Sequence, residues 1–240
     1  MTVLDIDIGN SFLKWRLVSQ TGQSQSGRCL VADYPQVFSG GLLAGVARVR
    51  VASVAGGAVN SALQTWVREQ LGLEAEFAVT GASALGVTNS YKDPSRMGVD
   101  RWLAMVAAYK RQQGACWVVD CGSAVTVEKL SEAGVHLGGY IVPGLPLMAR
   151  NLLSNTAEII VDRSVDAFEY TPGTDTSSAV QQGLNWVFRS MAHQLAREVS
   201  VPVYVTGGDG ELFARLMSEY HGECQYVPEL VLDGLAEVLG

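Results

Sequence analysis

The sequence contains few of the residues from which several common kinds of site are built. It has only 3 histidines and 4 cysteines, and no two cysteines form a C-x-x-C pair, so we expect no zinc site and reduced thiols. No histidine accompanies a nucleophile pattern, so a catalytic triad is not expected. The G-x-G-x-x-G motif of dinucleotide-binding folds and the P-loop motif G-x-x-x-x-G-K-[ST] are both missing.

Positive charge and long apolar runs are also scarce. Lys and Arg number 17 against 24 Asp and Glu, a net charge of −7, so we expect no nucleic-acid partner bound through a basic face. No stretch approaches the ~18 apolar residues of a membrane span, and the first apolar run carries Asp5 and Asp7 without a basic start. We therefore expect no membrane segment and no signal peptide, and we predict a cytoplasmic protein.

The remaining composition is typical of a globular chain. Apolar residues make up 48% of its 240 residues and there are only 7 prolines, so the chain can bury a core in one or two domains. Strands and helices alternate in two similar halves, residues 1–113 and 114–240. Each half opens with a strand, an Asp-x-Gly-polar turn and a second strand, which predicts an α/β fold with mixed sheets.

Hydrophobic periodicity predicts the individual elements. The expected strands span Thr2–Ile8, Phe12–Val18, Gln25–Val31, Arg48–Val54, Glu74–Val79, Ala115–Asp120, Ala124–Leu130, Val135–Val142, Val201–Val205 and Gln225–Val227. The expected helices span Tyr34–Ala47, Asn60–Leu71, Val99–Arg111, Leu145–Asn155, Ser177–Glu198, Glu211–Tyr220 and Leu230–Leu239.

The first group of candidate site residues is Asp7, Gly9, Asn10, Ser11 and Lys14. The glycine lets backbone amides approach a ligand, and the next two residues add side-chain donors. Lys14 returns toward the turn on the second strand and is one of only four lysines in the chain. Because an aspartate within an apolar strand is seldom buried without a partner or a task, phosphate binding with Mg²⁺ is favoured over an ordinary hairpin.

The second group repeats this pattern in the second half, with Asp120, Gly122, Ser123 and Thr126. Two such turns at matching places suggest a nucleotide held by both halves. The loop Thr206-Gly207-Gly208-Asp209 follows a strand and precedes a helix, so it could present amides to a ribose or phosphate. A plain strand-to-helix loop is the alternative.

The third group is Tyr91, Pro94, Asp100 and Arg101. Asp100 and Arg101 fall in the first turn of a predicted helix. The helix dipole favours an aspartate in the first turn, and this alone is a sufficient structural reason for Asp100. The same dipole disfavours an arginine there. Arginine recognises carboxylates and phosphates, so a substrate site is the other interpretation.

These motifs together resemble the type III pantothenate kinases, members of the superfamily that includes acetate and sugar kinases, Hsp70 and actin. The resemblance covers essentially the whole chain. The stretches that carry it are Asp7–Lys14, Asn89 with Tyr91, Pro94 and Gly98–Arg101, Asp120–Thr126, Gly138–Gly144, Asp175-Thr176 with Ala179 and Gly183, and Thr206–Gly208. Ser11 and Ser123 replace the family's usual Thr, Glu128 replaces an Asp, and Asp175 replaces an Asn.

The resemblance implies two actin-like (ribonuclease H-like) halves and ATP-dependent phosphorylation of pantothenate to 4'-phosphopantothenate, the first step of coenzyme A synthesis. It implies that Asp100 is the general base and that Asp120 binds a monovalent cation, K⁺ or NH₄⁺, with Mg²⁺ accompanying ATP. The residues implied to bind ATP are Asp7, Ile8, Gly9, Asn10, Ser11, Phe12, Leu13, Lys14 and Ser123. Those implied to bind pantothenate are Tyr91, Gly98, Val99, Asp100, Arg101 and Thr176. It also implies a homodimer in which Thr176 completes the pocket of the partner.

Two other functions remain open from the sequence. A noncatalytic nucleotide-binding regulator, such as an accessory factor for transcription, would share the fold but would not need Asp100 beside Arg101. A sugar or acetate kinase of the same superfamily is disfavoured by the short chain and by the Tyr91–Arg101 segment.

Overall fold

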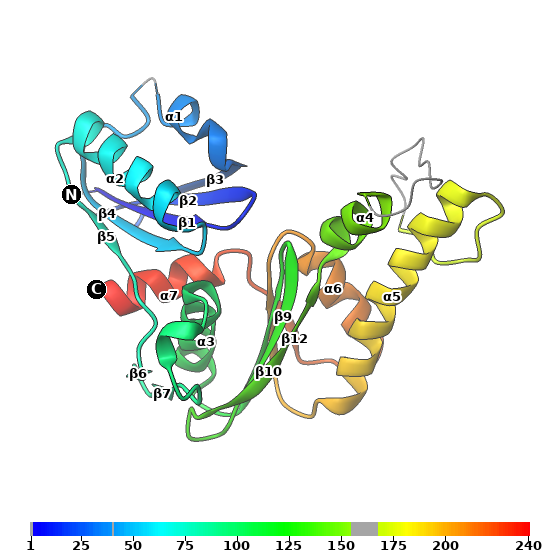
Figure 1. Ribbon diagram of the computed structural model, residues 1–240. Coiled ribbons are helices and arrows are strands. Elements are labelled where there is room, and N and C mark those ends of the chain that lie inside the picture. The colour runs from blue at the N-terminus through cyan, green and yellow to red at the C-terminus, as the bar shows by residue number, and fades with distance from the viewer. Residues whose placement is uncertain (1, 40, 155–167) are drawn as a thin grey trace. The chain divides into compact units, whose positions relative to one another are not determined.

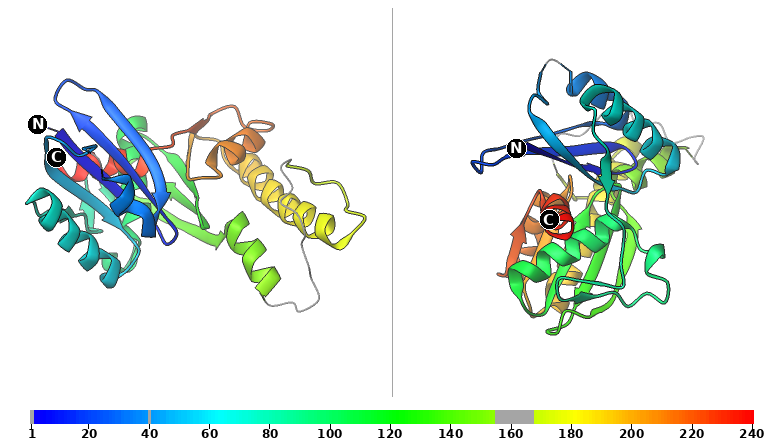
Figure 2. Two further views of the ribbon diagram at one scale, coloured as in Figure 1. Left: turned by 90° about the horizontal axis from the view of Figure 1, so that it is seen from above. Right: turned by 90° about the vertical axis from the view of Figure 1, so that its left-hand side faces the viewer.

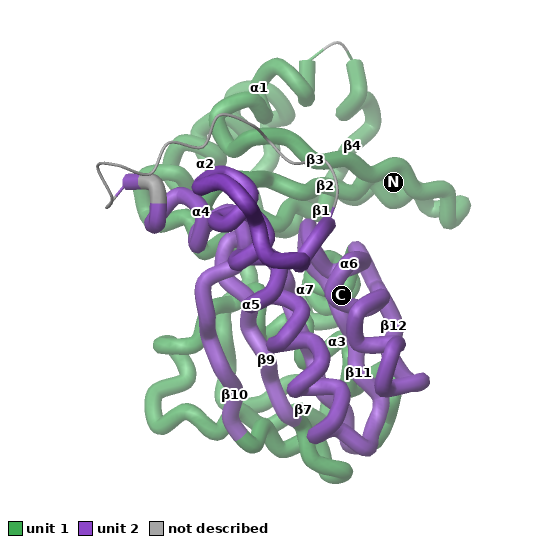
Figure 3. Tube along the Cα trace, turned by 90° about the vertical axis from the view of Figure 1, so that its right-hand side faces the viewer, with its two compact units in different colours: residues 1–114, 130–137, 229–240 green, residues 115–129, 138–228 purple. Residues whose placement is uncertain are grey.

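Two five-stranded mixed sheets form the framework of the protein (Figure 1). The structure is a computed structural model that describes residues 2–39, 41–154 and 168–240. Contacts divide the chain into unit 1, residues 1–114, 130–137 and 229–240, and unit 2, residues 115–129 and 138–228 (Figure 3). The expectation that residues 1–113 and 114–240 form two domains stays a prediction. The units have other bounds than these halves, because residues 130–137 and 229–240 group with residues 1–114.

The sheet of unit 1 has the order β3-β2-β1-β4-β5. Its first three strands form antiparallel hairpins, and β4 and β5 run parallel to β1. Their bounds are β1 Thr2–Ile8, β2 Phe12–Ser19, β3 Ser24–Leu30, β4 Val46–Ser53 and β5 Ala75–Phe77. A separate two-stranded hairpin consists of β6 Ser83–Ala84 and β7 Val87–Thr88.

The sheet of unit 2 repeats this topology in the order β10-β9-β8-β11-β12. The bounds of its strands are β8 Cys116–Cys121, β9 Ala124–Leu130, β10 His136–Pro143, β11 Val203–Thr206 and β12 Cys224–Tyr226. Asp7 of β1 lies beside Ala52 of the parallel strand β4, and Asp120 of β8 lies beside Thr206 of the parallel strand β11. The two aspartates therefore occupy matching positions in the two sheets.

Helices cover both faces of the sheet in unit 1, as the right-hand view of Figure 2 shows. Helix α2, Gly57–Leu71, packs with the short helix α1, Tyr34–Val37, on the face formed by fully buried Leu4, Ile6 and Ile8. Helices α3, Val99–Gln112, and α7, Leu230–Leu239, pack together on the opposite side, where α7 contacts β1 and β4. Because side chains alternate along a strand, Asp5 and Asp7 point to this second face.

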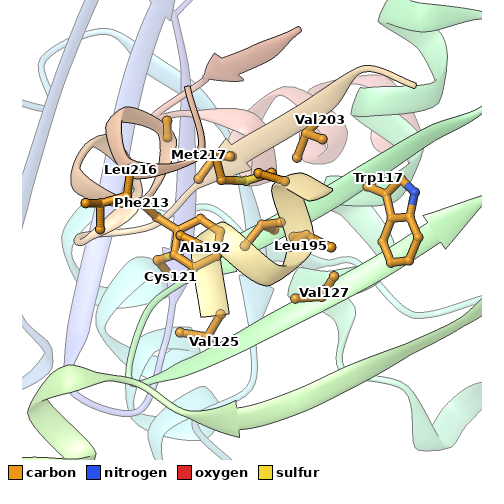
Figure 4. Close-up of a cluster of buried hydrophobic side chains, with 14 of the residues drawn as sticks. Trp117, Cys121, Val125, Val127, Ala192, Leu195, Val203, Phe213, Leu216 and Met217 are labelled. Atoms are coloured by element: carbon orange, nitrogen blue, oxygen red, sulfur yellow. The ribbon is translucent and has the colours of Figure 1, made fainter. Parts of the chain in front are cut away.

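The core of unit 2 lies between its sheet and two helices, α5, Thr176–Glu198, and α6, Gly210–Met217. Figure 4 shows Phe213 of α6 among side chains of β8, β9 and α5. Phe188 and Phe213 meet edge to face with ring centroids 5.3 Å apart, a geometry that adds to the gain from burying their area. Helix α4, Leu145–Ser154, packs against α5.

Most predicted elements are confirmed within one or two residues at each end, and β1, β9 and α7 have the predicted bounds. The helix predicted over Tyr34–Ala47 is wrong beyond Val37. Gly41 and Gly45 adopt φ of 89° and 78°, which a helix does not contain, and β4 begins at Val46. Within the described ranges, no helix is long and apolar enough to cross a membrane.

Candidate active site

The turn between β1 and β2 is held by backbone hydrogen bonds. The Gly9 amide donates to the Phe12 carbonyl at 3.0 Å, and the Val31 amide donates to the Ser11 carbonyl at 3.2 Å. Asn10 is exposed at the tip, and Phe12 is 41% exposed with the Arg28 guanidinium 3.6 Å from its ring centroid. The turn therefore presents polar groups and one aromatic ring on a rigid backbone.

The strands beside this turn divide their side chains between two faces. Ile8 and Leu13 pair across the hairpin and are fully buried in the core, so only their backbone groups can contact a ligand. Asp7 and Lys14 are the next pair, and both are half-buried on the other face. The structure thus places Asp7 and Lys14, which the sequence put in one candidate site, opposite each other on one face of the sheet.

The N-terminus of α3 holds the Asp100 carboxylate in one orientation. Asp100 Oδ1 accepts a hydrogen bond from the Arg101 amide at 2.7 Å, an interaction that satisfies one of the free amides of a first helical turn. A Cβ at Gly98 would lie 2.5 Å from the same oxygen. Gly98 is therefore needed for the close approach of this carboxylate, since any larger residue would displace it.

Arg101 and Tyr91, 10 residues apart in the sequence, meet in the structure. Arg101 Nη1 donates to the Tyr91 hydroxyl at 3.1 Å, and the guanidinium carbon lies 5.7 Å from the centre of the Tyr91 ring. The Tyr91 amide donates to Asn89 Oδ1 at 3.0 Å. The candidate substrate residues of the loop and of α3 thus form one hydrogen-bonded group.

Val54, which the sequence did not single out, connects the turn of β1 with the start of α3. Its amide donates to the Ile8 carbonyl at 3.0 Å, and its Cγ1 lies 3.7 Å from the place of a Cβ on Gly98. Ile8 is followed directly by Gly9, and Gly98 precedes Asp100 by two residues. Within unit 1, the phosphate-type turn and the acidic helix start therefore lie at the same end of the sheet.

In unit 2 the turn between β8 and β9 lies against the loop that follows β11. Gly207 has φ of 95°, and a Cβ there would overlap the Cys121 backbone. The Asp209 amide donates to the Cys121 carbonyl at 3.0 Å. The second phosphate-type turn and the loop Thr206–Asp209 therefore form one surface, of which half-buried Ser123 and Asp120 are part.

The thiol of Cys121 faces an acidic and apolar environment. Burial raises its pKa well above the ordinary value, and the nearby carboxylates of Asp120 and Asp209 raise it further. A thiol with a raised pKa is a poor nucleophile, so Cys121 is a structural residue here.

A family model described as type III pantothenate kinase matches residues 3–198. The chain belongs to the type III pantothenate kinase family. A curated type III pantothenate kinase from Ectopseudomonas mendocina is 40% identical and covers 98% of this chain and 97% of the relative. One from Marinobacter nauticus is 34% identical over the same shares of both chains. The family predicted from the sequence is therefore confirmed.

Solved structures with low sequence identity share the fold of this pantothenate kinase family member. A Campylobacter jejuni protein, named as a candidate Baf family transcriptional activator, is 22% identical with a TM-score of 0.57 and covers 98% of this chain and 96% of that one. A Listeria monocytogenes protein, named as a candidate N-acetylmannosamine kinase, is 14% identical with a TM-score of 0.51, covering 100% and 99%. These similarities show the fold alone, and the predicted actin-like fold with two similar sheets is confirmed.

Two residues that depart from the family's usual pattern have structural roles in this kinase family member. Glu128 is 1% exposed, and its carboxylate lies against the backbone of β10, where a Cβ on Gly139 would overlap it. Asp175 is the N-cap of α5: Oδ1 accepts from the Ser178 amide at 3.0 Å, in a capping box that Ser178 completes. Thr176, the first residue of the helix, is exposed.

Proposed function

We propose that this protein transfers the terminal phosphoryl group of ATP to the primary hydroxyl of pantothenate and forms 4'-phosphopantothenate. The observation that carries the proposal is the Asp100 carboxylate, which Gly98 and the Arg101 amide hold in one orientation beside the Tyr91–Arg101 pair. The relatives with this family's name support the substrate. The sequence alternative, a noncatalytic regulator, would not need this arrangement.

In the proposed reaction Asp100 accepts the proton of the substrate hydroxyl as the oxygen attacks phosphorus. A carboxylate is a weak base, but phosphoryl transfer has a loose transition state and depends mostly on positioning and charge neutralisation. Arg101 binds the carboxylate of pantothenate, because a guanidinium matches that group in charge and geometry. Tyr91, Gly98 and Val99 shape the same subsite.

The phosphates of ATP bind the polar turns. The residues proposed for this are Asp7, Ile8, Gly9, Asn10, Ser11, Phe12, Leu13, Lys14 and Ser123, with Ile8 and Leu13 acting through their backbones. Lys14 neutralises phosphate charge. Mg²⁺ enters with ATP, since it is commonly held by one or two carboxylates together with substrate phosphates. The loop Thr206–Gly208 lies near the adenosine.

Replacing the base tests the proposal. In an assay that couples ADP release to pantothenate addition, Asp100→Asn should lower kcat by about 10²–10⁴-fold with folding intact. Gly98→Ala should also lower kcat, because the new Cβ displaces the Asp100 carboxylate, whereas φ of −56° suits alanine. Asp93→Asn is the matched control: this exposed aspartate caps the short turn Pro94–Arg96, and asparagine caps equally well.

Two results would contradict the proposal. Wild-type turnover in Asp100→Asn would remove the base assignment. A wild-type protein that binds ATP but releases no ADP with pantothenate would favour the regulator instead.

We propose further that Asp120 binds a monovalent cation, K⁺ or NH₄⁺. Among residues 2–39, 41–154 and 168–240 there is no group of three or more His, Cys, Asp or Glu that could hold a metal ion. The half-buried Asp120 carboxylate at the end of β8 offers oxygen ligands, the donor type that hard cations prefer. Asp120→Ala should therefore lose stimulation by K⁺, measured as the ratio of rates in KCl and tetramethylammonium chloride. An unchanged ratio would place the cation elsewhere.

We also propose that the active unit is a homodimer. An apolar groove of about 470 Å³ lies between β9, β10 and α5, and its walls include Tyr140 and Trp186, which are 61% and 58% exposed. A second copy of the chain would cover this surface, which is otherwise a liability for a soluble protein. On α5, Leu195 belongs to the core, whereas Val187 is part of the exposed surface.

Complementation tests whether Thr176 reaches the pocket of the partner. Co-expressed Asp100→Asn and Thr176→Ala chains with different tags should form mixed dimers with one intact pocket. Random pairing makes half of the dimers mixed, so activity should return to about a quarter of wild type. Purified mixed dimers without activity would mean that each pocket is built from one chain. The cytoplasmic location and the absence of nucleic-acid partners stay predictions.

A further inference from the structure

His136, the first residue of β10, is a buried ring that the proposed reaction does not use. It is 1% exposed, and its Nδ1 lies 3.0 Å from Ser90 Oγ, so the two share a hydrogen bond. A buried imidazole without a partner would be costly, so this contact fixes the orientation of the ring. Ser90 is the residue directly before Tyr91 of the candidate substrate loop.

The same ring supports Tyr91 itself. The ring centroids of His136 and Tyr91 are 6.0 Å apart, and the planes are inclined by 33°. The Tyr91 hydroxyl also accepts a hydrogen bond from Arg101 Nη1. Tyr91 thus contacts both His136 and Arg101, and these contacts limit the movement of its side chain.

The backbone places His136 independently of its side chain. The Thr88 amide donates to the Gly134 carbonyl at 3.0 Å, and Thr88 forms a parallel bridge with Val135. All of these residues belong to unit 1. Substitution of the His136 side chain should therefore leave the segment in place and change only what the ring does.

We infer that His136 is a positioning residue for substrate binding, which holds Tyr91 so that Arg101 is preorganised for the carboxylate of the substrate. This inference rests on the proposed function, because Tyr91 and Arg101 are assigned to pantothenate there. A free arginine side chain must be ordered when it binds a carboxylate, and that loss of freedom weakens binding. His136 lowers this loss before the substrate arrives.

Three variants separate the two contacts of the ring. His136→Phe keeps a ring beside Tyr91 and removes Nδ1, whereas His136→Asn keeps a hydrogen-bonding atom for Ser90 and removes the ring. Ser90→Ala removes the hydroxyl at an exposed position and leaves the buried residue unchanged. We expect His136→Asn to raise KM for pantothenate by about 3–10-fold, the loss for ordering one long side chain. His136→Phe and Ser90→Ala should raise it less, with KM for ATP and kcat within about twofold of wild type.

A second substrate gives a readout that a merely structural role would not change. Pantothenol has a hydroxymethyl group in place of the carboxylate, so it gains nothing from a positioned Arg101. The ratio of kcat/KM for pantothenate to that for pantothenol should fall by about 3–10-fold in His136→Asn. The control is His221→Phe. This ring Nε2 lies 3.1 Å from the Val201 carbonyl in unit 2, whereas the Tyr91 loop belongs to unit 1, so its loss should leave the ratio unchanged.

The outcomes are distinct. An active wild type with an unchanged KM and substrate ratio in His136→Asn and Ser90→Ala overturns the inference and leaves the proposed function standing. Equal losses toward both substrates and toward ATP would also overturn it, since they indicate general damage. A wild type without pantothenate-dependent ADP release overturns the proposed function, and the inference with it.

Discussion

Asp5 should be one of the most sensitive positions for the stability of unit 1. Its carboxylate is fully buried and accepts hydrogen bonds from Arg50 Nε at 2.7 Å and from Arg16 Nη2 at 3.2 Å. Arg16 also donates to Asp233 of α7 at 2.6 Å, and Arg50 to the Ala236 carbonyl at 3.3 Å. The two arginines therefore connect the central strand to the C-terminal helix.

Asp5→Asn should destabilise the protein by about 3 kcal/mol, the lower end of the range for breaking a buried ion pair. The lower end applies because Arg16 keeps the carboxylates of Asp233 and Glu229 as partners, and Arg50 keeps the Ala236 carbonyl as an acceptor. For a chain of this size, about 3 kcal/mol corresponds to a fall in Tm of about 6–12 °C. Asparagine is nearly isosteric with aspartate, so the loss reflects charge rather than packing.

Thermal unfolding followed by circular dichroism at pH 7 measures this change. The matched control is Glu74→Gln, because Glu74 forms a solvent-exposed ion pair with Arg68 and such pairs contribute little. Hydrogen exchange gives a local readout: amides of Leu230–Leu239 should exchange faster in Asp5→Asn. If the Tm of Asp5→Asn falls no further than that of the control, the argument from the buried network is wrong.

Three further predictions concern stability and thiol chemistry. Burial and the nearby Arg189 lower the pKa of His193, although Glu219 lies 3.0 Å from its Nε2, so the folded state favours the neutral ring. The contribution of His193 to the free energy of unfolding should therefore be full above about pH 6.5 and fall as the pH drops through the folded pKa. His193→Gln should flatten the pH dependence of the free energy of urea unfolding between pH 7 and 5. Cys116 and Cys121 are both fully buried, and burial raises the pKa of Cys116 to about 12. Iodoacetamide at pH 8 should therefore label neither thiol until the protein is unfolded in guanidinium, as measured by mass spectrometry. A Cβ on Gly139 would overlap the Val127 carbonyl, so Gly139→Ala should lower Tm. A Cβ on Gly183, inside α5, would meet nothing within 4 Å, so Gly183→Ala should raise the free energy of unfolding by about 0.5–1 kcal/mol. Equal effects of the two substitutions on Tm would contradict this packing argument.

Local patterns were sufficient for much of the fold. The alternation in Thr2–Ile8 and the apolar spacing in Leu230–Leu239 predicted elements with the bounds that the structure has. The paired Asp-x-Gly turns predicted a fold with two similar mixed sheets, which the matching strand orders confirm. These features depend on neighbours within a few residues, and such information is present in any short window of sequence.

The helix predicted over Tyr34–Ala47 shows where local patterns mislead. Apolar residues there have a suitable spacing, but Gly41 and Gly45 take positive φ and the chain turns into β4. The side chains Tyr34 and Phe38 nevertheless join the core of unit 1. The predicted helix is thus right for Tyr34–Val37 and wrong after it, because apolar spacing alone does not show that the glycines end the helix.

The sequence by itself determined the fold class, the family and the residue types of the candidate site. Only the tertiary structure decided which of them can act through side chains: Ile8 and Leu13 lie in the core, while Asp7 and Lys14 share the other face. It also decided that Asp5 joins two arginines and that His136 supports Tyr91, 45 residues before it, through a ring contact. The physical reason is that burial, ion pairing and preorganisation depend on distances between segments far apart in the chain, and no spacing along the sequence encodes those distances.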